Sequence, residues 1–119
     1  MGARIVLHSD AIAPITTYED FPFSLAAAVR YGGFSPVEAV HACTGLAAEA
    51  IGLGDVAGAL ASGKAADVLV VDGDLSADIR AITRTRHVLR DGRVVAAGGW
   101  VRTTSSAISG QELWRRAID

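Results

Sequence analysis

The residue with the clearest capacity for chemistry is Asp10, which follows a short apolar run of isoleucine, valine and leucine at positions 5–7. A carboxylate at the end of a strand can bind a divalent metal ion or accept a proton from water. The commoner fate of such a residue is to cap the loop that follows the strand. Both interpretations stay open when the spacing is considered alone.

His8 lies two residues before Asp10, so the two side chains would point the same way along a regular strand. We predict either a histidine that supports the site or contacts substrate, or one that is simply hydrogen-bonded at the end of the strand. Ser9 is expected to be a loop hydroxyl and not a nucleophile, because no G-x-S-x-G turn surrounds it.

The remaining histidines and the cysteine do not form a ligand pattern. His41 lies in an expected helix and His87 in an expected strand, and neither has a second histidine at a spacing that would place two imidazoles on one metal. We interpret both as structural. Cys43 is the single cysteine, which excludes an internal disulfide, a thiolate zinc site and a redox pair. A reducing cytoplasm is the expected location.

A glycine-rich segment, Gly58–Ala65, imitates the phosphate-binding pattern G-x-x-x-x-G-K-[ST] but ends in alanine. The missing Ser or Thr hydroxyl is the group that holds Mg²⁺ in such a loop. The segment is also followed by an expected strand at 68–71, whereas a phosphate-binding loop opens a helix. We therefore reject a nucleotide site there.

Asp10 and the segment Gly58–Asp74 together resemble the end of an enzyme of the amidohydrolase superfamily, of the imidazolonepropionase and prolidase type. In that superfamily a carboxylate at the tip of the last barrel strand binds the catalytic metal. A segment of pattern G-x-I-x-x-G-K-x-A-D-[LV]-[VL]-[VL]-x-D-G then returns the chain to a small β-sandwich. Ser62 and Leu75 stand where the family often has proline, and both departures fall in turns. The resemblance covers most of the chain but only the C-terminal part of a family member, since a (β/α)8 barrel alone needs about 250 residues.

The resemblance implies an α/β fold: the C-terminal part of a (β/α)8 barrel, with its last strand and following helices, plus the C-terminal half of a small β-sandwich. It implies hydrolysis of C–N bonds in amides, cyclic amides or dipeptides with zinc or a similar divalent ion. Asp10 would be metal ligand and general base. Loop residues 12–18 would line the substrate entrance, with Tyr18 and His8 as weaker substrate contacts.

The family's other metal ligands have no counterparts in this sequence. The H-x-H of the first barrel strand, the bridging lysine or glutamate and two later histidines are all missing. A catalytic zinc normally takes three protein ligands, so Asp10, even with His8, cannot hold one alone. We expect no stoichiometric metal in the isolated chain, which is then inactive.

Composition limits the partners that the chain can have. Its 119 residues are half apolar and 20% charged, and the mean hydropathy of +0.33 predicts surfaces that meet a partner or further sequence. A net charge of -2 without runs of like charge argues against nucleic acid and membrane surfaces. We expect a small-molecule substrate and contact with the remainder of the enzyme or with a second copy.

Local patterns predict helices before residue 54 and strands after it. Phe21, Leu25 and Val29 share one face of an expected helix that ends at Gly32. Three helix starts are expected: an Asp20 cap followed by Pro22, a Ser35–Glu38 capping box, and a Thr44 cap of a short helix that ends at Gly52.

The second part of the chain has the pattern of a small sheet. Val68–Val71 predicts a buried strand, and Ile82–Arg90 with Arg93–Ala97 predicts a hairpin closed by a type I′ turn at Asp91-Gly92. The expected facing pairs are Leu89 with Val94, and Val88 with Val95. Five arginines are expected to form a solvated or edge-protecting face more readily than an anion site: Arg80, Arg84, Arg86, Arg90 and Arg93.

We divide the chain into residues 1–54, the last barrel strand and its helices; 55–99, the sandwich and hairpin segment; and 100–119, a tail with a short helix. Two functions compete. The chain is part of a metal-dependent amidohydrolase, or it is a non-catalytic fragment or stand-alone module that oligomerises or pairs with another subunit. The second hypothesis follows because a lone barrel strand leaves unpaired edges.

Overall fold

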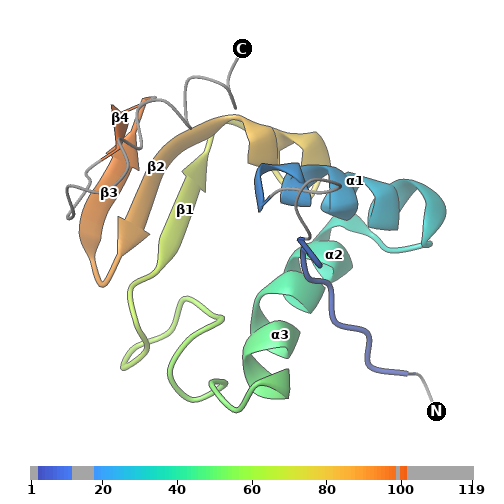
Figure 1. Cartoon of the computed structure of the whole chain (residues 1–119), viewed down its shortest axis with the longest axis horizontal. Helices are drawn as coiled ribbons and strands as arrows, with labels where there is room; N and C mark the ends of the chain where they lie inside the picture. Colours follow the sequence, from blue (N-terminus) through green and yellow to red (C-terminus); the bar gives the residue numbers. More distant parts are fainter. Residues whose placement is uncertain (1–2, 12–17, 99, 102–119) are drawn as a thin grey trace.

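The computed structural model describes residues 3–11, 18–98 and 100–101, and in this part of the chain helices come first and strands second. Figure 1 shows the helices on one side and the sheet on the other, joined by the loop that leads into β1 and by η2. The elements in chain order are η1 (Tyr18–Asp20), α1 (Phe21–Tyr31), α2 (Pro36–Cys43), α3 (Gly45–Ala50), β1 (Val68–Val71), η2 (Ile79–Thr83), β2 (Thr85–Arg90), β3 (Arg93–Ala97) and β4 (Trp100–Val101).

Helix α1 begins directly after the short turn η1. Pro22 lies in its first turn, where the missing N–H leaves no hydrogen bond unmade. Asp20 occupies the N-cap position with a φ of -77°, and its side chain makes no capping bond to the helix. The prediction that the Asp20 side chain caps this helix is therefore wrong. The preceding turn η1 already gives the backbone at Asp20 helical geometry. The helix ends as predicted at Gly32, whose amide donates to the Ala28 carbonyl at 2.9 Å.

Helix α2 begins with the predicted capping box. The Ser35 hydroxyl accepts from the Glu38 amide at 3.2 Å, and the Glu38 carboxylate accepts from the Ser35 amide at 2.8 Å. This backbone bond, followed by the bond from the Ser35 hydroxyl, lowers the pKa of Glu38 from its ordinary 4.5. At the other end, the Thr44 hydroxyl donates to the Val40 carbonyl at 2.7 Å and does not cap α3, contrary to prediction.

The core is small and lies where α1, α2 and η2 meet. Its buried members are Leu25, Ala39 and Ile79, and the predicted apolar face of α1 adds Phe21 and Val29 beside Leu25. Because Ile79 comes from η2, the core joins the helices to the segment that enters the sheet. The division at residue 54 stays a prediction.

The sheet is an antiparallel meander of order β1-β2-β3-β4. The predicted type I′ turn is confirmed, with φ values of 48° at Asp91 and 73° at Gly92. Strand β2 begins at Thr85, three residues later than expected, because Ile82 belongs to η2.

The register of the hairpin contains a β-bulge. Leu89 pairs with Val94 as predicted, but Val88 pairs with Ala96 and leaves Val95 between the two pairs. The prediction that Val88 faces Val95 is therefore wrong by one residue.

Strand β1 lies at the edge of the sheet and is only half buried. It spans the predicted residues, yet Leu69 is 45% exposed and Val70 is 40% exposed. The expectation of a buried strand is wrong because, within the described residues, β2 is the single strand that pairs with β1.

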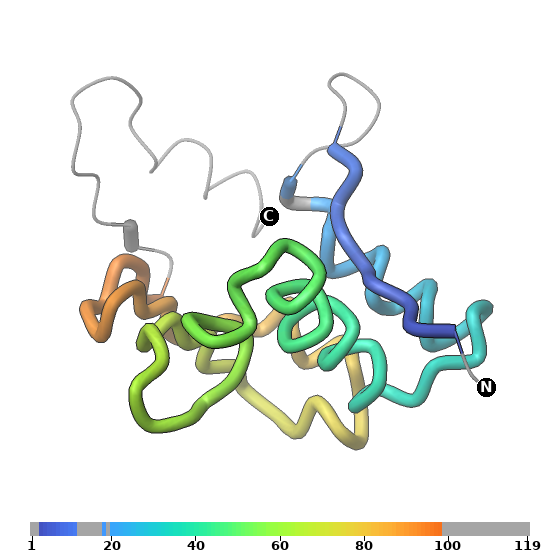
Figure 2. The backbone as a smooth tube through the Cα atoms, turned by 90° about the horizontal axis from the view of Figure 1, so that it is seen from below, coloured from blue at the N-terminus to red at the C-terminus, as the bar shows by residue number. Residues whose placement is uncertain are grey.

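The N-terminal segment does not form the predicted strand. Residues 5–7 have no regular secondary structure, and Ile5 is 50% exposed. The Leu7 amide donates to the Ala42 carbonyl at 3.2 Å, so the end of α2 holds this segment in the absence of a neighbouring barrel strand. Figure 2 shows it as the blue tube beside the helices, away from the hairpin.

The described residues thus combine three α-helices with a small antiparallel sheet, while the barrel and sandwich remain predictions. The short helix expected in the tail lies outside these residues. No helix in the described ranges is long and apolar enough to cross a membrane.

Candidate functional site

Asp10 lies in a turn directly after the segment that α2 holds. Its φ of 44° is left-handed, a conformation that aspartate tolerates better than most residues. The residue is exposed, and its amide donates to Nδ1 of His8 at 3.1 Å. The structure therefore brings together His8 and Asp10 at an exposed position.

The two residues meet for a different reason from the one that the sequence suggested. A regular strand would have placed both side chains on one face, but the left-handed backbone at Asp10 ends any such alternation. Contact comes instead from the imidazole, which accepts a hydrogen bond from the amide two residues later. Aspartate and histidine are both over-represented at positive φ, and this tendency was the one clue to the turn.

The expected substrate loop falls mostly outside the described residues, which resume at Tyr18. Tyr18 begins η1 and is 80% exposed, so its ring is available to a ligand.

The described residues do not by themselves fit a metal ion. Within residues 3–11, 18–98 and 100–101, no three histidine, cysteine, aspartate or glutamate side chains are grouped closely enough to hold one. Asp10 would supply one ligand, and a catalytic zinc normally takes three from protein. Any metal centre that uses Asp10 needs ligands from outside the described part of the chain.

His41 and His87 are not brought to Asp10. His41 lines a cavity of about 380 Å³ between residues 3–5 and α2, together with Arg4 and Glu38, and Asp10 is not among the lining residues. The ring of His41 lies close to Gly45, where an added Cβ would come within 2.8 Å of it. Their structural role stays our interpretation.

The glycine-rich segment that carries the resemblance forms part of the loop between α3 and β1, and its residues hydrogen-bond to the start of that loop. The Lys64 ammonium group donates to the carbonyl of Gly54 at 2.5 Å and is 3.5 Å from that of Ala57. The next amide, of Ala65, donates to the Val56 carbonyl at 2.7 Å. Lys64 thus closes the loop onto itself, a role that composition alone did not reveal.

Asp67, at the end of the same segment, holds the hairpin. Its Oδ1 accepts from the Asp91 amide at 2.9 Å, and the Gly92 amide donates to the Ala66 carbonyl at 2.9 Å. The A-D pair of the motif therefore fixes the type I′ turn against the start of β1.

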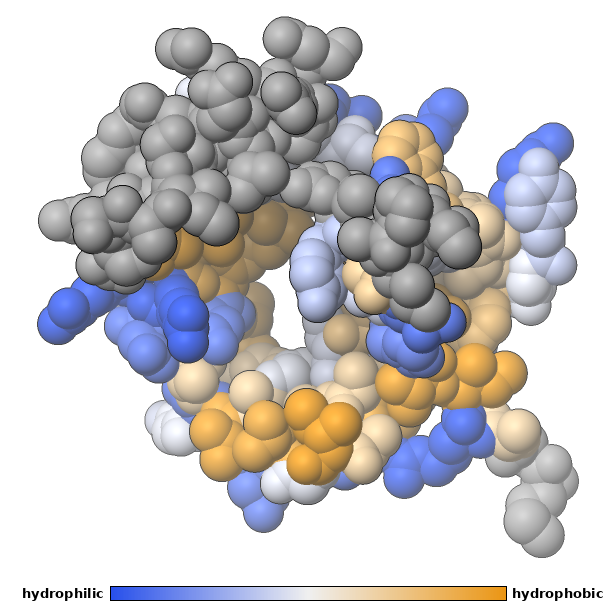
Figure 3. Space-filling view, viewed as in Figure 1, coloured by the Kyte–Doolittle hydropathy of each residue, from blue (hydrophilic) through white to orange (hydrophobic). Residues whose placement is uncertain are grey.

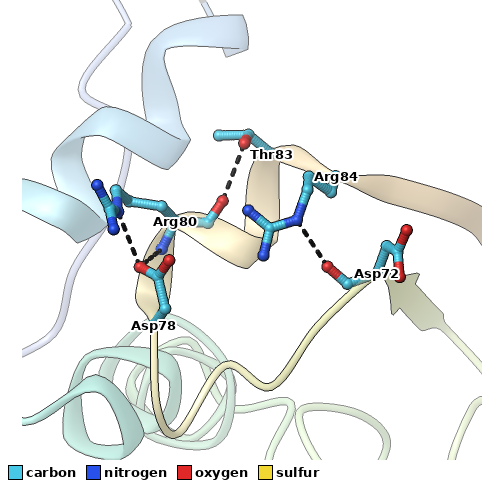
Figure 4. A network of polar contacts seen from close by, with 5 residues as sticks. All are labelled: Asp72, Asp78, Arg80, Thr83 and Arg84. Carbon is cyan, nitrogen blue, oxygen red and sulfur yellow. Dashed lines mark hydrogen bonds and ion pairs between the residues drawn. The ribbon is translucent and has the colours of Figure 1, made fainter.

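Arginines at the opposite end of the sheet are engaged by nearby oxygens, as Figure 4 shows for two of them. Arg84 Nε donates to the Asp72 carbonyl at 2.8 Å, and Arg86 forms an exposed ion pair with the Asp72 carboxylate at 2.7 Å. The hydrogen bond from the Arg80 side chain lowers the pKa of Asp78. These contacts agree with a solvated face more than with an anion site.

A sequence model of the amidohydrolase family matches residues 1–95. This chain belongs to the amidohydrolase family. The imidazolonepropionase of Thermoplasma volcanium is 32% identical to it over 97 residues, which cover 79% of this chain and 24% of that protein.

Two solved structures share the fold of this amidohydrolase chain. A candidate prolidase from Bifidobacterium longum is 31% identical, with a TM-score of 0.61 over 83% of this chain and 23% of that one. Molinate hydrolase is 29% identical, with a TM-score of 0.62 over 75% of this chain and 21% of that one. The chain thus spans about a quarter of the length of the relatives it matches. The resemblance to the superfamily is confirmed, and with it a fold related to the TIM barrel.

Proposed function

We propose that this chain is part of a metal-dependent amidohydrolase that cleaves C–N bonds in amides, cyclic amides or dipeptides. Asp10 is a ligand of a zinc or similar divalent ion and accepts the proton of the attacking water. The remaining ligands and the rest of the barrel come from sequence that this chain does not contain. The enzyme acts on a small molecule in the cytoplasm.

The observation that carries the proposal is the position of Asp10. In a barrel, the chain's polar groups at the C-terminal ends of strands form the active site. Asp10 lies three residues after the segment that would be the last strand, it is exposed, and its own backbone is left-handed. Family membership supports the assignment of Asp10, because the superfamily has a metal-binding carboxylate at the end of its last barrel strand.

The contribution of Tyr18 is proposed on weaker grounds. Its exposed ring lies seven residues along from the start of the loop at Ala11, at the beginning of η1. We expect Tyr18 to contact substrate and to influence KM more than kcat, because its ring would contribute to binding.

The test is a pair of matched substitutions in the full-length enzyme of which we propose this chain to be a part. Asp10→Asn removes the charge and the base but suits the left-handed backbone, and Asp91→Asn is its control, since Asp91 is also exposed and has a φ of 48°. Hydrolysis of dipeptides, acyl amides and cyclic amides should fall at least about 100-fold in the first variant. It should be unchanged in the second. Equal activity of the two variants would remove Asp10 from the mechanism.

A second candidate function is assembly. Large apolar side chains are exposed on the loop after α3, including Ile51 at 72% and Leu60 at 81%, and Figure 3 shows apolar surface along the lower edge of the molecule. This surface and the outer edge of β1 fit the remainder of the enzyme or a second copy of the chain. The coding sequence upstream of Met1 separates the two functions: an in-frame H-x-H with later histidines supports the enzyme, and a stop codon with a ribosome-binding site supports the module.

A further inference from the structure

The backbone at Asp10 adopts a conformation that needs a local cause. Asp10 and Asp91 are the two described residues other than glycine with positive φ. Asp91 is held by the type I′ turn and by the bond from its amide to Asp67. Asp10 is not part of a hairpin, because it follows a segment without regular secondary structure.

His8 supplies the bond that closes the turn at Asp10. Its Nδ1 accepts from the Asp10 amide at 3.1 Å, so the ring takes the place that a backbone carbonyl has in an ordinary turn. A neutral imidazole that accepts at Nδ1 carries its proton on Nε2. The bond therefore favours the tautomer of His8 that is protonated on Nε2 and supports the left-handed conformation of Asp10.

We propose that His8 is a positioning residue, which holds Asp10 in the left-handed turn and so sets the direction of its carboxylate. The inference rests on the proposed function of Asp10 and assigns His8 a role through the backbone. It differs from direct contact with substrate, because the atom that matters is Nδ1 and its partner is an amide of the same chain.

Two substitutions separate the atoms of the ring. In His8→Asn, the side-chain oxygen occupies the place of Nδ1, two bonds from Cβ, and can accept from the Asp10 amide. In His8→Gln, the amide group lies one bond farther out and mimics Nε2 instead. If His8 positions Asp10, His8→Asn should keep its function. If His8 instead binds substrate through Nε2, His8→Gln should keep its function.

The first measurement uses the 119-residue chain as it is. Nuclear magnetic resonance should detect a nitrogen–nitrogen coupling across the hydrogen bond between the Asp10 amide and His8 Nδ1. Absence of that coupling in the folded chain overturns the inference, whatever the enzyme does.

The second measurement is steady-state hydrolysis by the longer protein. We expect kcat to fall about 100-fold in His8→Gln with KM little changed, because a small displacement of a catalytic group has this effect. His8→Asn should keep most of the wild-type kcat. If Asp10→Asn abolishes turnover and His8→Gln does not, the inference fails alone. If Asp10→Asn leaves turnover intact, both the proposed function of Asp10 and the inference that depends on it are wrong.

Discussion

Replacing Gly58 by alanine tests whether the loop between α3 and β1 is packed as tightly as the structure shows. Gly58 has a φ of 87°, and an added Cβ would lie 2.6 Å from the Cβ of Ala48 and 2.9 Å from the carbonyl oxygen of Thr44. Both neighbours belong to the helical part and cannot move aside as a flexible side chain would. Gly63 is a matched control, because it has a φ of 86° and open space within 4 Å of the added atom.

The losses of stability expected for Gly58→Ala and Gly63→Ala differ only by the steric overlap of the added Cβ at position 58. A left-handed alanine costs about 1 to 2 kcal/mol, which both variants share. Forcing an extra carbon into a filled site adds about 1 to 3 kcal/mol. We therefore expect Gly63→Ala to lose about 1 to 2 kcal/mol and Gly58→Ala about 2 to 5 kcal/mol of the free energy of unfolding.

Urea unfolding followed by circular dichroism measures both values. In thermal unfolding each 1 kcal/mol corresponds to a fall in Tm of roughly 4 to 8 °C for a domain of about this size. Equal losses in Gly58→Ala and Gly63→Ala would refute the reasoning, because the clash with Ala48 and Thr44 would then not exist in solution.

The remaining predictions concern two titrating groups. The hydrogen bonds from Ser35 lower the pKa of Glu38 from 4.5, so the stability they give is fully present above about that pH and is lost as the pH falls through the lower value of the folded state. Ser35→Ala should cost about 1 kcal/mol at neutral pH and make this acid limb shallower without removing it, because the bond from the backbone amide of residue 35 remains; an unchanged slope in urea titrations would contradict the assignment. Burial raises the pKa of Cys43 from 9.0, so iodoacetamide should alkylate it more slowly in the folded chain than in urea, as mass spectrometry can follow; equal rates would show the thiol to be open.

The elements that the sequence predicted well are those determined by neighbouring residues. The Ser35–Glu38 capping box and the Asp91-Gly92 turn each depend on a few adjacent side chains, and both are present. Elements that depend on distant partners were predicted poorly. Residues 5–7 have the composition of a buried strand, but a strand needs a neighbour to pair with, and the described chain supplies the end of α2 instead.

The limits of the site prediction have the same physical origin. Asp10 was identified by its place after an apolar run and by the resemblance, but the turn that contains it was not, because alternation assumes a regular backbone. The bulge at Val95 was not predicted for a related reason. An inserted residue leaves the local pattern of apolar side chains unchanged. The sequence of residues 58–67 was sufficient to identify the family motif. It did not predict that Lys64 bonds to the carbonyl of Gly54 and closes the loop.

The central claim is that Asp10 belongs to a metal centre whose other ligands lie elsewhere. Zinc content of the purified 119-residue chain, measured after equilibrium dialysis, tests it most directly, with Asp10→Ala and the control Asp91→Ala beside the wild type. The account predicts clearly less than one equivalent in all three proteins, since one carboxylate is two ligands short of a normal catalytic zinc site. A full equivalent in the wild type and in Asp91→Ala that disappears in Asp10→Ala would contradict it, because the chain would then hold a complete site of its own.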